Sequence, residues 1–98
     1  MLTITPRAAR VSIPMSIMYR RTGDEDWLFC KVVNLSESGV LFGPTELQPG
    51  TSIEVLLSPP IQVGSLAIGK QVCVAEVVRA SDMGVAAVRF EECRFLLE

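Results

Sequence analysis

Apolar and polar residues alternate along several short stretches of the chain. Between Val11 and Tyr19 every second residue is apolar, which is the period of a half-buried strand. Pro14 interrupts this stretch and has no backbone N–H, so we expect it at a sheet edge or a bulge. Further apolar stretches follow. The sequence therefore predicts six strands, at 11–19, 27–33, 40–42, 52–57, 71–80 and 85–90.

Turn-forming residues separate these stretches about every ten residues. The polar segment 20–26 predicts a hairpin loop, and Pro49-Gly50 suits the central positions of a type II turn. No segment between two strands is long enough for a helical crossover, so the strands are expected to be antiparallel. A barrel is favoured over a sandwich because closure leaves no open sheet edge. The expected fold class is all-β, a six-stranded antiparallel β-barrel.

A chain of 98 residues fits one domain. We expect a flexible, arginine-bearing segment at 1–10, the barrel at 11–90, and a short helix or tail at 91–98. The helix is suggested by Glu91 and Glu92, which suit a first helical turn. The residues expected in the barrel core are Val11, Ile13, Val32, Val55, Val77 and Val88.

The charge and hydropathy of the chain exclude two classes of partner. The formal net charge is −2, which argues against a non-specific binder of duplex DNA. No apolar run approaches the ~18 residues of a membrane span, so no membrane insertion is expected. The first residues lack the apolar region of a signal peptide, so the sequence predicts a cytoplasmic protein.

The chain has no histidine, which removes the commonest general base and the commonest zinc ligand. Cys30, Cys73 and Cys93 are far apart in the sequence and form no Cys-x-x-Cys pair. We therefore expect three free thiols, no metal site, no cofactor and no catalytic residue. The protein is not expected to be an enzyme.

Two polar features remain. The first 21 residues hold four arginines and no acid, although the chain as a whole is acidic; Arg7 and Arg10 are the first two of these arginines. Arginine suits bidentate contacts with phosphate and stacking on bases. Asn34-Leu35-Ser36-Glu37-Ser38-Gly39 follows the second predicted strand, where its amide, hydroxyl and backbone N–H groups could contact an anion. On the residues alone, a solvated terminus and an ordinary turn are the favoured explanations of these two features.

Together the two features resemble a PilZ domain, in which an arginine segment precedes the first strand and an Asn-x-Ser-x-x-Gly turn follows about 25 residues later. Later pieces are similar to the family in order and spacing, so the resemblance covers nearly the whole chain. They are Val40-Leu41-Phe42, Leu47-Gln48-Pro49-Gly50, Glu76-Val77-Val78-Arg79 and the segment from Met83 to Phe90.

The resemblance implies a six-stranded barrel with a C-terminal helix and a bacterial receptor for cyclic di-GMP. Carried over by position, Arg7 and Arg10 would clamp the ligand, and Asn34, Ser36 and Gly39 would hold a guanine. One position departs from the family pattern. In the Arg-x-x-x-Arg motif that ends at Arg10, the first arginine falls on Pro6, which carries no charge, and this implies weakened affinity.

Several readings of the function stay open at this point. The first is a cyclic di-GMP receptor. The second is a PilZ-like adaptor that does not bind the nucleotide and acts through a protein partner or as a homo-oligomer. An oligonucleotide-binding barrel is a third, disfavoured by the six aromatic residues and the acidic balance, and an enzyme is a distant fourth.

Overall fold

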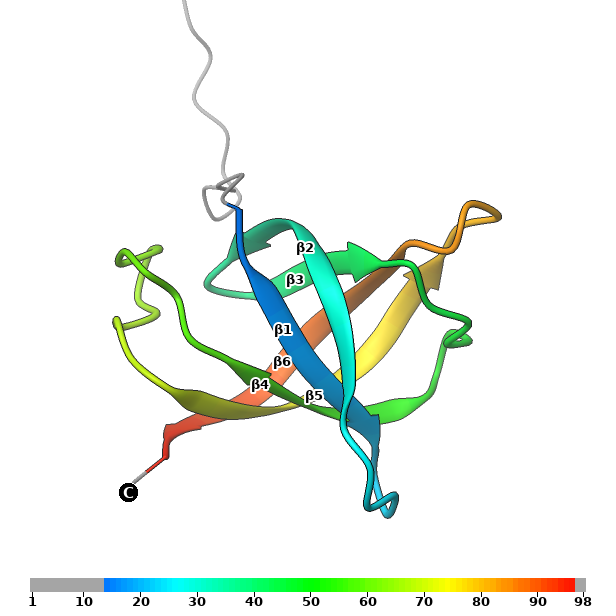
Figure 1. Cartoon of the computed structure of the whole chain (residues 1–98), viewed down its shortest axis with the longest axis horizontal. Coiled ribbons are helices and arrows are strands. Elements are labelled where there is room, and N and C mark those ends of the chain that lie inside the picture. The colour runs from blue at the N-terminus through cyan, green and yellow to red at the C-terminus, as the bar shows by residue number, and fades with distance from the viewer. Residues whose placement is uncertain (1–13, 97–98) are drawn as a thin grey trace, which may run out of the picture.

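Six antiparallel strands close into a barrel in the computed structural model, which describes residues 14–96. The order around the barrel is β1-β2-β3-β6-β5-β4, as Figure 1 shows. The strands are β1 (Ser16–Arg21), β2 (Leu28–Ser36), β3 (Gly39–Gly43), β4 (Ser52–Leu57), β5 (Gln71–Ala80) and β6 (Ala86–Phe95). The expected fold, a closed six-stranded antiparallel barrel, is confirmed. Among the described residues there is no helix long and apolar enough to cross a membrane.

Alternate residues of each strand point into the barrel and form its core, as the two-residue period of a strand requires. Of the expected core residues, Val55, Val77 and Val88 are buried, whereas Val32 is only half-buried. Val11 and Ile13 lie outside the described residues. The largest fully buried side chain is Phe42, whose ring lies 5.1 Å from that of Tyr19.

The turn at Pro49-Gly50 has the expected type II character. Gly50 has a φ of 90°, and the backbone N–H of Thr51 donates to the carbonyl of Gln48 at 3.2 Å. A positive φ at the third residue of a turn favours glycine because a Cβ atom is strained there.

β2 contains a bulge that the sequence did not reveal. Its pairing with β3 shifts between Val32 and Asn34, so Val33 is the extra residue that the bulge inserts into β2. Because of this extra residue, Val32 and Leu35 both pair with inward-facing residues of β3. Asn34 pairs with Leu41 on the outer side of the barrel. The segment predicted as a turn at 34–39 therefore belongs mostly to strands: residues 34–36 lie in β2, Gly39 begins β3, and only Glu37 and Ser38 form the turn.

The predicted C-terminal helix at 91–98 is wrong for the part that the structure describes. β6 continues through Glu91 and Glu92 to Phe95, and its residues from Glu92 to Phe95 pair with the first half of β5. The N–H of Leu96 then donates to the carbonyl of Lys70 at 2.9 Å. A helix this short is marginal in water, whereas the long strand β5 offers backbone partners at every step.

The prediction of three free thiols is also wrong. Cys73 and Cys93 form a disulfide with an S–S distance of 2.01 Å, and Cys30 is the free cysteine. The two bonded residues lie directly opposite each other on β5 and β6, with their Cα atoms 4.0 Å apart. The sequence did not reveal this pairing, because the two cysteines are 20 residues apart and the residues that face each other depend on the register of β5 and β6. That register contains two irregularities.

Candidate functional site

The tight turn between β2 and β3 brings together three of the residues expected in the site. Asn34 and Ser36 lie at the end of β2, and Gly39 begins β3 directly opposite Ser36. The other two expected residues, Arg7 and Arg10, lie outside the described residues, as does Pro6.

The side chain of Ser36 is buried at this turn and is hydrogen-bonded to it. It is only 1% exposed. Its hydroxyl accepts a hydrogen bond from the backbone N–H of Ser38 at 3.2 Å and lies 3.0 Å from the Ser38 hydroxyl. It also donates to the carbonyl of Gly39 at 3.4 Å. Such a serine fixes the shape of the turn, because it satisfies backbone groups that would otherwise need water.

Gly39 is required by a close approach of two strands. A Cβ atom at this position would overlap the carbonyl oxygen of Val88 and lie 3.1 Å from its carbonyl carbon. Immediately beside this contact, the N–H of Phe90 donates to the carbonyl of Ser38 at 2.8 Å. The turn is therefore held against β6 by backbone packing that only glycine permits.

The outer side of four strands beside this turn forms a continuous surface, which we call the basic outer face. In one row across the strands, Asn34 pairs with Leu41, Leu41 with Ala87, and Ala87 with Arg79. In the next row, Gly39 pairs with Arg89. Residues paired across strands share a face of the sheet, so these side chains lie on one surface.

The two arginines of this surface were missed by the sequence reasoning. Arg89 forms an ion pair with Glu76, Nη2 to Oε1 at 3.1 Å, and both side chains are partly exposed. Within residues 14–96, no salt bridge involves Arg79. Arg79 and Asn34 are 45 residues apart in the chain, so only the barrel register places them on one row. Positive charge beside an amide and an apolar floor of Leu41 and Ala87 suits a planar, anionic ligand.

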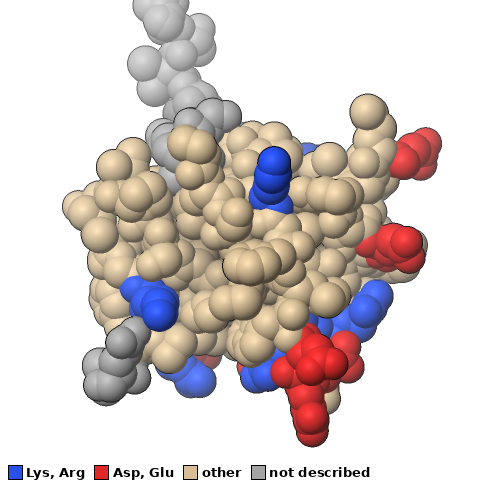
Figure 2. Space-filling view, in the orientation of Figure 1, with Lys and Arg blue, Asp and Glu red and all other residues tan. Residues whose placement is uncertain are grey.

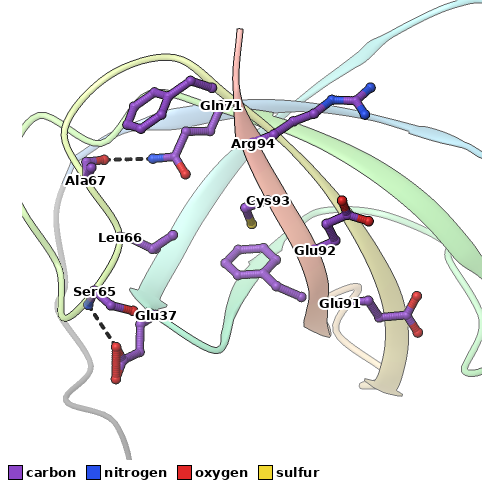
Figure 3. Close-up of a pocket in the computed structure, with 11 residues that line it drawn as sticks. Glu37, Ser65, Leu66, Ala67, Gln71, Glu91, Glu92, Cys93 and Arg94 are labelled. Atoms are coloured by element: carbon purple, nitrogen blue, oxygen red, sulfur yellow. Dashed lines mark hydrogen bonds between the residues drawn. The ribbon is translucent and has the colours of Figure 1, made fainter.

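A cavity of about 350 Å³ lies on the other side of the turn, between β6 and the loop that joins β4 to β5 (Figure 3). Leu66, Phe90 and Phe95 contribute apolar surface to it. The labelled carboxylates Glu37, Glu91 and Glu92 also line it, with Arg94 as the one cation among the lining residues. This surplus of negative charge disfavours an anionic ligand, so the basic outer face is the better candidate for a nucleotide.

Glu37 connects the turn to the β4–β5 loop. Its Oε1 accepts a hydrogen bond from the backbone N–H of Ser65 at 2.8 Å, drawn as a dashed line in Figure 3. Hydrogen bonds from the side chain and backbone of Ser65 lower the pKa of the Glu37 carboxyl below its usual range. Glu37 therefore remains ionised at neutral pH and ties the loop to the turn.

The free cysteine does not have the surroundings of a nucleophile. Cys30 is buried, and its thiol donates to the carbonyl of Pro44 at 3.0 Å. Burial raises the pKa of this thiol, although hydrogen bonds involving Tyr19 and Lys31 oppose the shift. A cysteine held as a neutral thiol is a poor nucleophile.

Comparison with protein-family models gives a match to the PilZ domain. The family model of the PilZ domain matches residues 5–96, which is nearly the whole chain and includes Pro6, Arg7 and Arg10 as well as the β2–β3 turn. No curated protein sequence matches the chain.

Proposed function

The chain belongs to the PilZ domain family, and on that premise we propose that it is a receptor for cyclic di-GMP. PilZ domains are binding and regulatory modules, and the family is generally associated with this nucleotide. The ligand would lie on the basic outer face, beside the β2–β3 turn. The observation that carries this proposal is the shared outer surface of Asn34 and two arginines, Arg79 and Arg89.

The chemistry of the ligand is complementary to that surface. Cyclic di-GMP carries two phosphodiester anions and two guanines. Arginine binds phosphate oxygens through paired N–H groups and also stacks on bases. Leu41 and Ala87 are half-buried and provide an apolar floor for the flat face of a guanine, and the amide of Asn34 offers a donor and an acceptor to its edge.

We assign Arg7 and Arg10 the role of a clamp that covers the ligand from the N-terminal side. Pro6 stands where the family motif has its first arginine. The loss of one charge-assisted contact costs about 1.5–3 kcal/mol, which corresponds to a factor of roughly ten to a hundred in affinity. Arg79 and Arg89 supply positive charge from the barrel side, which compensates in part for Pro6.

Calorimetric titration of the full chain with cyclic di-GMP at low salt tests the proposal. We expect binding to the native chain and tighter binding to Pro6→Arg. Arg89→Ala should weaken binding about tenfold or more because it removes a cation from the surface.

Arg94→Ala is the matched control. Arg94 lies on the same strand, β6, but pairs with Val72 at the opposite end of the strand, away from the turn. Its removal should leave the affinity unchanged. Absence of heat with millimolar nucleotide, for both the native chain and Pro6→Arg, would refute the receptor proposal.

A protein-interaction adaptor that does not bind the nucleotide is the second candidate, and one observation favours it. The side chain of Phe29 on β2 is 76% exposed, and large exposed apolar groups are typical of interaction surfaces. The adaptor proposal takes the place of the receptor proposal if the titration gives no binding.

A further inference from the structure

The disulfide between Cys73 and Cys93 lies where β6 extends beyond the closed part of the barrel. From Ala86 to Arg89, β6 pairs with β3 on one edge and with β5 on the other. From Glu92 to Phe95 it pairs with β5, and within residues 14–96 no second strand pairs with this part. We call residues 92–96 the terminal arm. The arm borders the cavity of about 350 Å³ described above.

Side-chain packing holds the terminal arm weakly. Cys93 is half-buried and packs against the core, whereas the other side chains of the arm are exposed, Phe95 at 54% and Leu96 at 37%. The remaining attachments are the backbone pairing with β5 and the hydrogen bond from the Leu96 N–H to the Lys70 carbonyl at 2.9 Å. Segments with few buried side chains open more easily than the core. The disulfide is therefore the main side-chain attachment of the arm.

The two sulfurs of the disulfide differ in access. Cys73 is fully buried on β5, where it also pairs with Val55 of β4, and it does not line the cavity. Cys93 is half-buried and lines the cavity. Figure 3 shows its side chain on the side of β6 that faces Leu66, while Arg94 extends to the opposite side. A thiol from solution therefore approaches the disulfide from the cavity, at the sulfur of Cys93.

The charges around the cavity determine which reagent suits it. Its loop wall belongs to residues 58–69, which contain no charged residue, and Figure 2 shows uncharged surface over this loop. The carboxylates among the lining residues are Glu37, Glu91 and Glu92. Like charges repel, so a dithiol that carries no charge besides its reacting thiolate is favoured over an acidic thiol.

We propose that this disulfide is a site of thiol–disulfide exchange in the folded protein, opened by an uncharged dithiol at Sγ of Cys93. One thiolate of the dithiol attacks this sulfur and forms a mixed disulfide, while the bond to Cys73 breaks and Cys73 leaves as a thiolate that takes up a proton. The second thiolate of the reagent attacks the reagent's own sulfur in the mixed disulfide. Cys93 then leaves as a thiolate and is protonated in turn. Two electrons and two protons pass to the protein, and the dithiol becomes a disulfide.

Reduction should release the terminal arm and leave the barrel closed. Closure depends on the pairing of β6 with β3 and with the second half of β5, which lies between Ala86 and Phe90. The disulfide is outside that region. The arm contributes one wall of the cavity, so we expect the cavity in the oxidised chain alone. The inference does not rest on the proposed function, because the arm and the basic outer face share no residue.

Reduction of the full chain by dithiothreitol, without denaturant, tests whether the folded state reacts. Thiols are blocked at timed intervals and counted by mass. The rate of reduction should rise in proportion to the dithiol concentration and exceed the rate of global unfolding, which denaturant kinetics measure. A rate that reaches a plateau at the unfolding rate would show that the bond opens only in the unfolded chain, and this result would overturn the proposal.

Two variants identify the sulfur that is attacked. In a Cys30→Ser background, Cys73→Ser leaves Cys93 as the one thiol, and Cys93→Ser leaves Cys73. Hydroxyethyl disulfide, an uncharged probe, should modify Cys93 about tenfold or more faster than Cys73, because exchange depends on access to the sulfur. Equal rates, or faster reaction at Cys73, would contradict the approach from the cavity. Thermal unfolding of both variants checks that they are folded.

Hydrogen exchange of the oxidised and reduced chain tests the release of the arm. The Leu96 amide should exchange about tenfold or more faster after reduction. The Val77 amide is the internal control, because it donates to the carbonyl of Thr51 at 2.9 Å in the closed part of the barrel, and its exchange should not change. Cys30→Ser should show the same difference as the native chain. Equal protection of Leu96 in the two redox forms would refute a tether at this disulfide.

Discussion

Gly39 at the start of β3 lies directly opposite Arg89 on β6. Backbone pairing therefore joins the β2–β3 turn, which follows Asn34, to Arg89, which follows Val88. Their relative position is a property of the barrel and does not depend on a ligand. This fixed arrangement leads to the first prediction.

Gly39→Ala should destabilise the protein by about 3 kcal/mol, because the added methyl group overlaps the carbonyl of Val88 and neither backbone can yield easily. Chemical denaturation measures the loss. Asn34→Ala is the comparison, and it should cost about 1 kcal/mol of stability. Equal stability of Gly39→Ala and the native chain would show that the strands are free to separate at this point.

Arg10→Ala should weaken cyclic di-GMP binding by about 1.5–3 kcal/mol, because a charge-assisted contact is lost. Asn34→Ala should weaken it less, since its amide is neutral. Calorimetry at two salt concentrations measures both effects. Affinity of the native chain should fall as salt rises, because contacts between cations and phosphate are screened. An affinity that is independent of salt would argue against a phosphate clamp.

The link between Glu37 and Ser65 should depend on pH. The folded chain holds the pKa of this carboxyl below its usual range, so its contribution is fully present above the ordinary pKa of a glutamate. The contribution is lost as the pH falls through the lowered value. We expect the Ser65 amide to become less protected from hydrogen exchange over that range of acid pH.

Two variants separate this link from other effects of acid. Glu37→Ala should leave the Ser65 amide equally exposed at every pH. Glu91→Ala removes a carboxylate that lines the same cavity, and it should keep the native pH dependence. A Ser65 amide that shows the same acid transition in Glu37→Ala as in the native chain would assign the transition to another group.

Thiol titration of the unfolded, non-reduced chain should find one thiol, because Cys73 and Cys93 are bonded and Cys30 is free. After reduction the count should rise to three, the number of cysteines in the sequence. Reduction opens the loop that the disulfide closes between Cys73 and Cys93, which are 20 residues apart. This should lower the free energy of unfolding by about 3 kcal/mol. A count of three before reduction would show that the bond is absent in the isolated protein.

The fold could be predicted from the sequence because the strand signals are local. The two-residue period, Pro49-Gly50 and the absence of a helical crossover are all visible along the chain. The end of the chain could not be predicted in the same way. Glu91 and Glu92 satisfy the local rule for a helix start, but the partner strand decides their structure.

The candidate site was predicted only in part. Asn34, Ser36 and Gly39 form a short motif, and its spacing is visible in the sequence. The approach of Arg79 and Arg89 depends on the pairing of β3, β6 and β5. Pairing between strands so far apart in the chain is not encoded at any single position. The disulfide escaped prediction for the same reason.

The bulge at Val33 makes the number of residues in β2 as important as their identity. Val32, Asn34 and Ser36 would share one face of a regular strand, and the extra residue is what turns Asn34 outward while Val32 faces the core. A deletion of Val33 would remove the bulge, restore regular alternation and leave the amide of Asn34 facing outward. A regular strand of the present length would instead place Val32 and Asn34 on the same face, so either the core would lose Val32 or the outer surface would lose the amide. The bulge is therefore what allows a strand of this length to give one of these side chains to the core and the other to the surface.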